Sequence, residues 1–241
     1  MKYLLTAFSL LISCLAQAQD VTALLKAADR FRTSSDNVEI HTQIQVYKAD
    51  GTLDKDRQYT VFAQANHQSL VLMQSPAEKG QKVLMLRDDF WLLMPASQRP
   101  MRITPTQKLL GDASTGDIAT LSWSQDYSGQ VVGEERCGEV TCQHLSLQAN
   151  RKGVSYQRIE LWLGKVKHEP LRAQLFVQSD KLAKEARFVL DKTGREVSEM
   201  ILLDSLSNHK ETRVKYLSRK DRTVPESWLN PMFLARNPAL E

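Results

Sequence analysis

The 241-residue sequence lacks the short motifs that mark common catalytic and nucleotide-binding sites. It has no G-x-S-x-G nucleophile elbow, no Walker A loop and no G-x-G-x-x-G turn. Its five histidines are scattered and form no H-x-x-x-H pair, so nothing places two imidazoles on one helix face around a metal ion. We therefore expect no catalytic residues, no metal site and no cofactor, and we predict that the protein is not an enzyme.

The sequence also lacks a strong charge imbalance. Lys and Arg exceed Asp and Glu by only four, 32 against 28, and no dense basic run is present. This argues against a nucleic-acid partner. The composition, with 42% hydrophobic and 25% charged residues, is typical of a soluble globular chain. For a chain of this length that reads as mainly β, one large domain is the expected organisation.

The only long apolar run stands at the N-terminus, and it is too short for a stable transmembrane helix. Lys2 precedes the apolar segment Tyr3–Leu15, and an A-x-A cleavage site ends at Ala18. This pattern predicts a secretory signal peptide. The alternative is a lipobox that ends at Cys14, which would make Cys14 a lipid anchor on a membrane.

Cysteine is scarce, and once the leader is set aside only Cys137 and Cys142 remain. An even pair in an exported protein indicates a disulfide, here across a tight hairpin. A zinc site is the weaker interpretation because no second pair has ligand spacing, and a redox site is weaker because C-x-x-C is absent.

The rest of the chain predicts a leading helix followed by many short strands. The apolar residues between Val21 and Phe31 recur at helical spacing, which predicts a helix over Gln19–Thr33. Short apolar or alternating runs bounded by turn formers predict an antiparallel sheet, sandwich or barrel. Pro105–Ser122 is expected to be a loop with short helical turns, and Pro225–Ala235 an apolar tail docked on the sheet. The predicted strands are Val38–Val46, Gln58–Ala65, Leu70–Gln74, Lys82–Leu86, Phe90–Pro95, Met101–Thr104, Tyr127–Arg136, Val140–Gln148, Tyr156–Leu163, Leu171–Gln178, Glu185–Leu190, Arg195–Asp204 and Glu211–Leu217.

The predicted sheet has a surplus of Leu and Met on one face. Most of these side chains can be explained as ordinary core. The functional interpretation is that a curved sheet leaves part of this face as a groove for a flexible apolar ligand, such as an acyl chain. The residues expected to line such a cavity are Ile44, Leu72, Val83, Met85, Phe90, Leu92, Met94 and Leu161. If the register of a strand were shifted by one residue, its predicted cavity-lining side chains would point to the opposite face of the sheet.

The stretch from Leu70 to Thr104, with its flanks, resembles the LolA-like branch of the periplasmic lipoprotein-sorting carriers. In that branch a final Gly-Ser-Asp-Phe-like segment follows, from which Gly111–Asp117 departs here. Gly133-Glu134 and Cys142, which come later in the chain, also fit the pattern of this branch. The residues that carry the resemblance are Pro76, Gly80-Gln81, Leu84, Asp89, Trp91, Pro95, Arg99, Arg102-Ile103, Leu110-Gly111-Asp112 and Asp117.

The resemblance implies a mainly β (α+β) domain over residues 19–241, after a signal peptide at 1–18. It implies a single antiparallel, incomplete β-barrel wrapped around the N-terminal helix and short lid helices. The implied function is non-enzymatic carriage of a lipid or lipoprotein acyl chain through the periplasm, with an inner-membrane transporter and an outer-membrane acceptor as partners. The alternative is a regulatory module that senses lipid or envelope stress and acts with an inner-membrane partner.

Overall fold

The computed structural model describes residues 20–33, 35–97, 99–103, 117–118, 122–205 and 211–240. The predicted signal peptide, Cys14 and most of the predicted loop at 105–122 lie outside the described residues. None of the described helices is long and apolar enough to cross a membrane.

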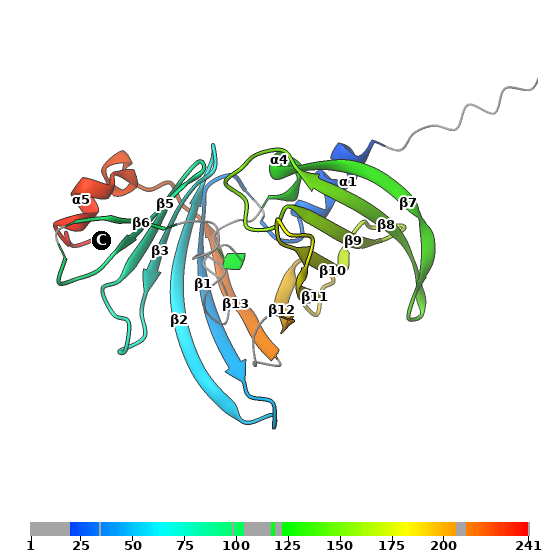
Figure 1. Ribbon diagram of the computed structural model, residues 1–241, viewed down its shortest axis with the longest axis horizontal. Coiled ribbons are helices and arrows are strands. Elements are labelled where there is room, and N and C mark those ends of the chain that lie inside the picture. Colours follow the sequence, from blue (N-terminus) through cyan, green and yellow to red (C-terminus); the bar gives the residue numbers. More distant parts are fainter. Residues whose placement is uncertain are drawn as a thin grey trace, which may run out of the picture.

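The fold is one continuous antiparallel sheet of thirteen strands that curves strongly and does not close into a barrel (Figure 1). Its order is β6-β5-β4-β3-β2-β1-β13-β12-β11-β10-β9-β8-β7, so β6 and β7 are the two edges. This confirms the mainly β, incomplete barrel that the sequence and the resemblance predict. The strands are β1 (Val38–Tyr47), β2 (Leu53–Gln64), β3 (Gln68–Met73), β4 (Lys82–Leu86), β5 (Asp89–Leu93), β6 (Met101–Ile103), β7 (Tyr127–Cys137), β8 (Val140–Ala149), β9 (Arg158–Gly164), β10 (Pro170–Phe176), β11 (Leu182–Leu190), β12 (Val197–Asp204) and β13 (Glu211–Asp221).

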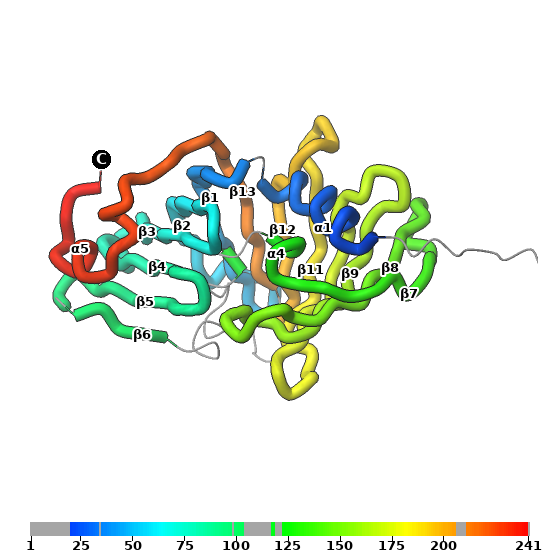
Figure 2. The backbone as a smooth tube through the Cα atoms, turned by 90° about the horizontal axis from the view of Figure 1, so that it is seen from above, coloured from blue at the N-terminus to red at the C-terminus, as the bar shows by residue number. Residues whose placement is uncertain are grey.

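Helix α1 (Val21–Asp29) lies within the predicted helix Gln19–Thr33, and Asp20 is its N-cap. The Asp20 carboxylate accepts a hydrogen bond from Thr22 N at 2.9 Å, which satisfies one of the free N–H groups of the first turn. The short helix α4 (Trp123–Asp126) follows the partly described loop and packs beside α1. Both helices lie on the same side of the curved sheet, which we call the inner face (Figure 2).

The inner face carries the main hydrophobic core. On β1 the alternating residues Val38, Ile40, Ile44 and Val46 all point to it, as strand geometry requires of positions two apart. Leu24, Leu25 and Ala28 of α1 pack against the same cluster. The amphipathic face of the first helix therefore covers the sheet, which is the role its sequence pattern indicates.

The opposite, outer face has a smaller core under the C-terminal tail. The 3₁₀ helix η1 (Glu226–Leu229) and helix α5 (Pro231–Ala235) lie against the β3–β5 region (Figure 1). The Trp228 ring meets Phe62 edge-on, with 5.5 Å between ring centroids. This confirms that the apolar tail docks on the sheet.

Cys137 and Cys142 form the predicted disulfide. It joins the end of β7 to the start of β8 across a two-residue turn, and Gly138 in that turn has a positive φ of 67°. The disulfide therefore cross-links the hairpin at this edge of the sheet, where β7 pairs with β8 alone among the described strands.

Candidate functional site

Six of the eight residues predicted to line an apolar cavity lie together on the inner face. Five are buried within the main core cluster, and the sixth packs against that cluster. They come from strands far apart in the sheet order, β1, β4, β5 and β9. That these side chains bind a ligand stays a prediction. The five buried residues are Ile44, Val83, Met85, Phe90 and Leu161, and the sixth is Leu92.

The other two lie elsewhere. Leu72 packs against the outer cluster, beneath the C-terminal tail. In β3 it is Val71 that pairs with Val83 and shares the inner face, so the strand presents the opposite set of side chains from the one predicted. Strand β3 is apolar at consecutive positions because both faces of the sheet are covered there. Hydrophobicity alone therefore could not tell which of its side chains point to the inner face. Met94 follows the end of β5 and belongs to neither cluster.

Side chains of the described residues pack over the part of the inner face next to α4. Trp123 of α4 and Ile118 are buried in the inner cluster, and the Trp123 ring meets Phe188 of β11 edge-on at 5.5 Å. The cavity left between Trp123 and strands β9–β12 measures about 40 Å³. That is room for little more than one water molecule, at ~30 Å³ each. An acyl chain could occupy this region only after these side chains move.

A buried ion pair holds residue 117 inside the sheet. Lys184 Nζ of β11 lies 2.6 Å from Asp117 Oδ2, and both side chains are almost fully buried. Tyr156 donates its hydroxyl to Asp117 Oδ1 at 2.6 Å. Burial also raises the pKa of the neighbouring Tyr127, whose hydroxyl donates to the Tyr156 carbonyl at 2.9 Å. The sequence analysis missed Lys184, although a lysine at an inward position of an alternating strand is a usable signal.

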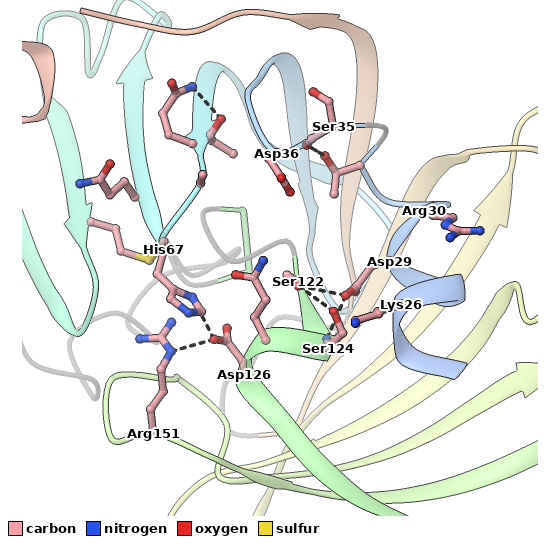
Figure 3. Close-up of a pocket in the computed structure, with 17 residues that line it drawn as sticks. Lys26, Asp29, Arg30, Ser35, Asp36, His67, Ser122, Ser124, Asp126 and Arg151 are labelled. Atoms are coloured by element: carbon pink, nitrogen blue, oxygen red, sulfur yellow. Dashed lines mark hydrogen bonds and ion pairs between the residues drawn. The ribbon is translucent and has the colours of Figure 1, made fainter. Parts of the chain in front are cut away.

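A wider polar pocket opens at the mouth of the curved sheet, between α1, α4, the β2–β3 turn and residue 151 (Figure 3). Its volume is about 400 Å³. Most of the residues that line it are polar or charged, but apolar atoms, including those of Ala63 and Met85, also contribute to its surface. Because Met85 belongs to the inner cluster as well, the pocket meets the apolar inner face at this residue.

One wall of this mouth pocket is α4, which is tied to α1 by Asp29. The Asp29 carboxylate accepts hydrogen bonds from Trp123 N at 2.7 Å and from Ser124 N at 2.9 Å. The Ser122 hydroxyl donates to it at 2.9 Å (Figure 3). These bonds satisfy free N–H groups at the start of α4 and fix the position of Trp123 over the inner face.

The other wall is a polar contact that we call the clasp, formed by His67, Asp88, Asp126, Arg151 and Gly153. Asp126 Oδ1 accepts from Arg151 Nε at 2.7 Å and lies 3.2 Å from His67 Nδ1 (Figure 3). Arg151 also pairs with Asp88, whose carboxylate accepts from Gly153 N at 3.1 Å. Burial alone would lower the pKa of Arg151, but its bonds to Asp126 and Asp88 raise it.

The clasp joins the two ends of the open sheet. The β2–β3 and β4–β5 turns supply His67 and Asp88, whereas α4 and the β8–β9 loop supply the other three residues. Among the described residues, no cluster of His, Cys, Asp and Glu could hold a metal ion. The chemistry on offer at the mouth is therefore hydrogen bonding and charge pairing around an apolar floor.

Similar folds occur among solved structures. The LolA superfamily protein from Nitrosomonas europaea is 26% identical, with a TM-score of 0.79, and the match covers 88% of this chain and 98% of that one. A domain described as an outer membrane lipoprotein-sorting protein from Vibrio parahaemolyticus is 16% identical, with a TM-score of 0.69, and the match covers 89% of this chain and 98% of that one. A DUF1329 family protein from Desulfovibrio piger is 20% identical, with a TM-score of 0.68, and the match covers 87% of this chain and 97% of that one.

At the level of sequence, a family model described as an uncharacterized protein matches residues 65–236, which is more than half of the chain. No curated protein shows a significant match. The matched segment includes strands β3–β13 and all five residues of the clasp.

Proposed function

The chain is a non-enzymatic member of the LolA-like fold family, and from that premise we propose that it carries a lipid or a lipoprotein acyl chain against the inner face of its sheet. The finer part of the proposal is that it works in the periplasm, taking its cargo from an inner-membrane transporter and delivering it to an outer-membrane acceptor. The printed name of the Vibrio parahaemolyticus neighbour, with its reference to lipoprotein sorting, agrees with this role.

The observation that carries the proposal is the meeting of the apolar inner face with the mouth pocket at Met85. Each CH₂ group removed from water contributes about 0.8 kcal/mol, so an acyl chain crosses an aqueous compartment only when it is shielded. The six clustered cavity residues offer such shielding from four different strands. No covalent chemistry is needed for this task.

Loading of the inner face next to α4 requires an opening movement, because Trp123 and Ile118 pack over it. An incoming chain would enter past Met85 and displace Trp123 and Ile118 from the inner cluster. Such a movement would break the bonds from Asp29 to α4 and loosen the clasp.

Native mass spectrometry of protein purified from the periplasm under non-denaturing conditions tests the proposal. We expect a mature mass that begins at Gln19, two hydrogens light for the disulfide, together with a bound lipid that organic solvent extracts. A second sample, stripped of lipid, should take up an added fatty acid and shift the fluorescence of Trp123. Protein that carries no lipid and also refuses added lipid would overturn the carrier function.

A further inference from the structure

A second cleft lies at the C-terminal end of α1 and shares Arg30 with the mouth pocket. Arg30 and Phe31 at the end of α1 form one wall, Lys167 of the β9–β10 turn forms another, and Gly194 and Arg195 of the β11–β12 turn complete it. Its volume is about 490 Å³. Figure 2 shows α1 beside the ends of the strands that these two turns connect. Three cations therefore converge from three separate segments of the chain.

No acidic side chain is among the described residues that line this basic cleft. Within the part of the chain that the structure describes, Arg30, Lys167 and Arg195 form no side-chain ion pair. The acids nearest in sequence to Arg195 are engaged elsewhere. Asp191 accepts from Arg195 N at 2.9 Å within its own turn, and Glu196 pairs with Arg219 at 3.1 Å. The positive charge of the cleft is thus left for an external anion.

The rim next to the cleft carries two exposed valines. Val166 precedes Lys167 at the tip of the β9–β10 turn and is 87% exposed, and Val140 in the adjoining hairpin is 46% exposed. The two tips lie side by side, because Lys165 N donates to the Thr141 carbonyl at 3.1 Å. Apolar tips bordered by lysines suit the boundary of a bilayer, where cations meet phosphate and small apolar groups enter the interface.

We propose that the basic cleft and its valine rim dock the protein on a bilayer surface that contains anionic phospholipids. A lipid phosphate would lie between the guanidinium groups of Arg30 and Arg195 and the ammonium group of Lys167. Arg30 lines the mouth pocket as well as the cleft, so docking in this way places the mouth beside the bilayer. The inference stands apart from the carrier function, since a protein could bind the surface without accepting an acyl chain.

Sedimentation with lipid vesicles tests the docking proposal. We expect the protein to bind vesicles of phosphatidylglycerol in phosphatidylcholine, to ignore vesicles of phosphatidylcholine alone, and to release as salt is raised. Each cation near an anionic surface strengthens binding roughly fivefold. The triple variant Arg30→Gln, Lys167→Gln, Arg195→Gln should therefore bind on the order of a hundredfold more weakly.

A matched triple variant separates the cleft from overall charge. Lys79→Gln, Lys181→Gln and Arg187→Gln remove the same charge from exposed positions outside the cleft, and this variant should keep most of the binding. Equal losses in the two variants would overturn the proposal, as would the absence of binding to anionic vesicles. Release by inorganic phosphate, but not by chloride at the same ionic strength, would instead assign the cleft to a free phosphate and would also overturn bilayer docking.

Discussion

At the mouth of the sheet, Asp126 Oδ1 accepts a 2.7 Å hydrogen bond from Arg151 Nε, and Asp126 is 1% exposed. A carboxylate so deeply buried is costly unless it is paired. Here it meets Arg151 on one side and His67, 3.2 Å away, on the other. The contacts of Asp126 with His67 and of Arg151 with Asp88 link this end of the sheet to the turns near the other end.

Asp126→Asn should destabilise the protein, because the largely buried Arg151 would lose one of its two charged partners and keep only Asp88. Loss of one member of a buried pair costs about 3–5 kcal/mol, and the partial exposure of Arg151 reduces this to about 2–3 kcal/mol. Urea unfolding followed by circular dichroism measures the change. Asp180→Asn is the matched control, because Asp180 pairs with Arg158 at an exposed site, and its cost should be at most about 1 kcal/mol. Equal costs would show that the clasp adds no special stability.

Gly153→Ala should open the clasp without removing any charge. A Cβ at this position would lie 2.5 Å from the Asp88 Cα, so one of the two backbones must shift. We expect a stripped sample of this variant to take up a fluorescent fatty acid faster than the unchanged protein, as stopped-flow measurement would record. Gly133→Ala is the control, since a Cβ there meets nothing within 4 Å. An unchanged uptake rate would mean that the clasp does not limit loading.

The sequence predicted the thirteen strands, the first helix, the disulfide and the docked tail, because each depends on residues close together in the chain. It did not predict the clasp. The Asp88-Asp89 pair reads as an ordinary turn, and the partner of Asp88 stands 63 positions away at Arg151. The same limit applies to Leu72, since only the C-terminal tail on the outer face makes an apolar residue suitable there.

Lys184→Met should destabilise the protein by about 3–5 kcal/mol, because it removes the ammonium group that pairs with the buried Asp117 carboxylate. The double variant Lys184→Met, Asp117→Leu should recover much of this loss, since apolar side chains can replace a buried pair at little cost. A double-mutant cycle in urea measures the coupling. Additive losses would show that the ion pair is not the interaction that holds residue 117 inside the sheet.

Glu39 should make the stability depend on pH in the acid range. Burial alone would raise its pKa, but hydrogen bonds from Lys220, Arg222 and His41 hold the pKa below its ordinary value of 4.5. Its stabilising contribution is therefore complete above pH 4.5 and is lost as the pH falls below that value through the pKa of the folded state. Glu39→Gln should flatten this part of the stability profile. An equally steep acid loss in the variant would assign the effect to other carboxylates.

Met85→Gln and Leu72→Gln together test which face receives the cargo. Met85 is 4% exposed on the inner face and also lines the mouth pocket, whereas Leu72 packs under the C-terminal tail. A polar amide at position 85 should weaken fatty-acid binding on the order of tenfold, because a buried apolar side chain of this size contributes about 1.5–3 kcal/mol. Leu72→Gln should lower the free energy of unfolding but leave the affinity of the folded protein unchanged. The opposite result, with affinity lost only at position 72, would place the cargo on the outer face and would make the C-terminal tail, rather than α4, the element that the cargo displaces.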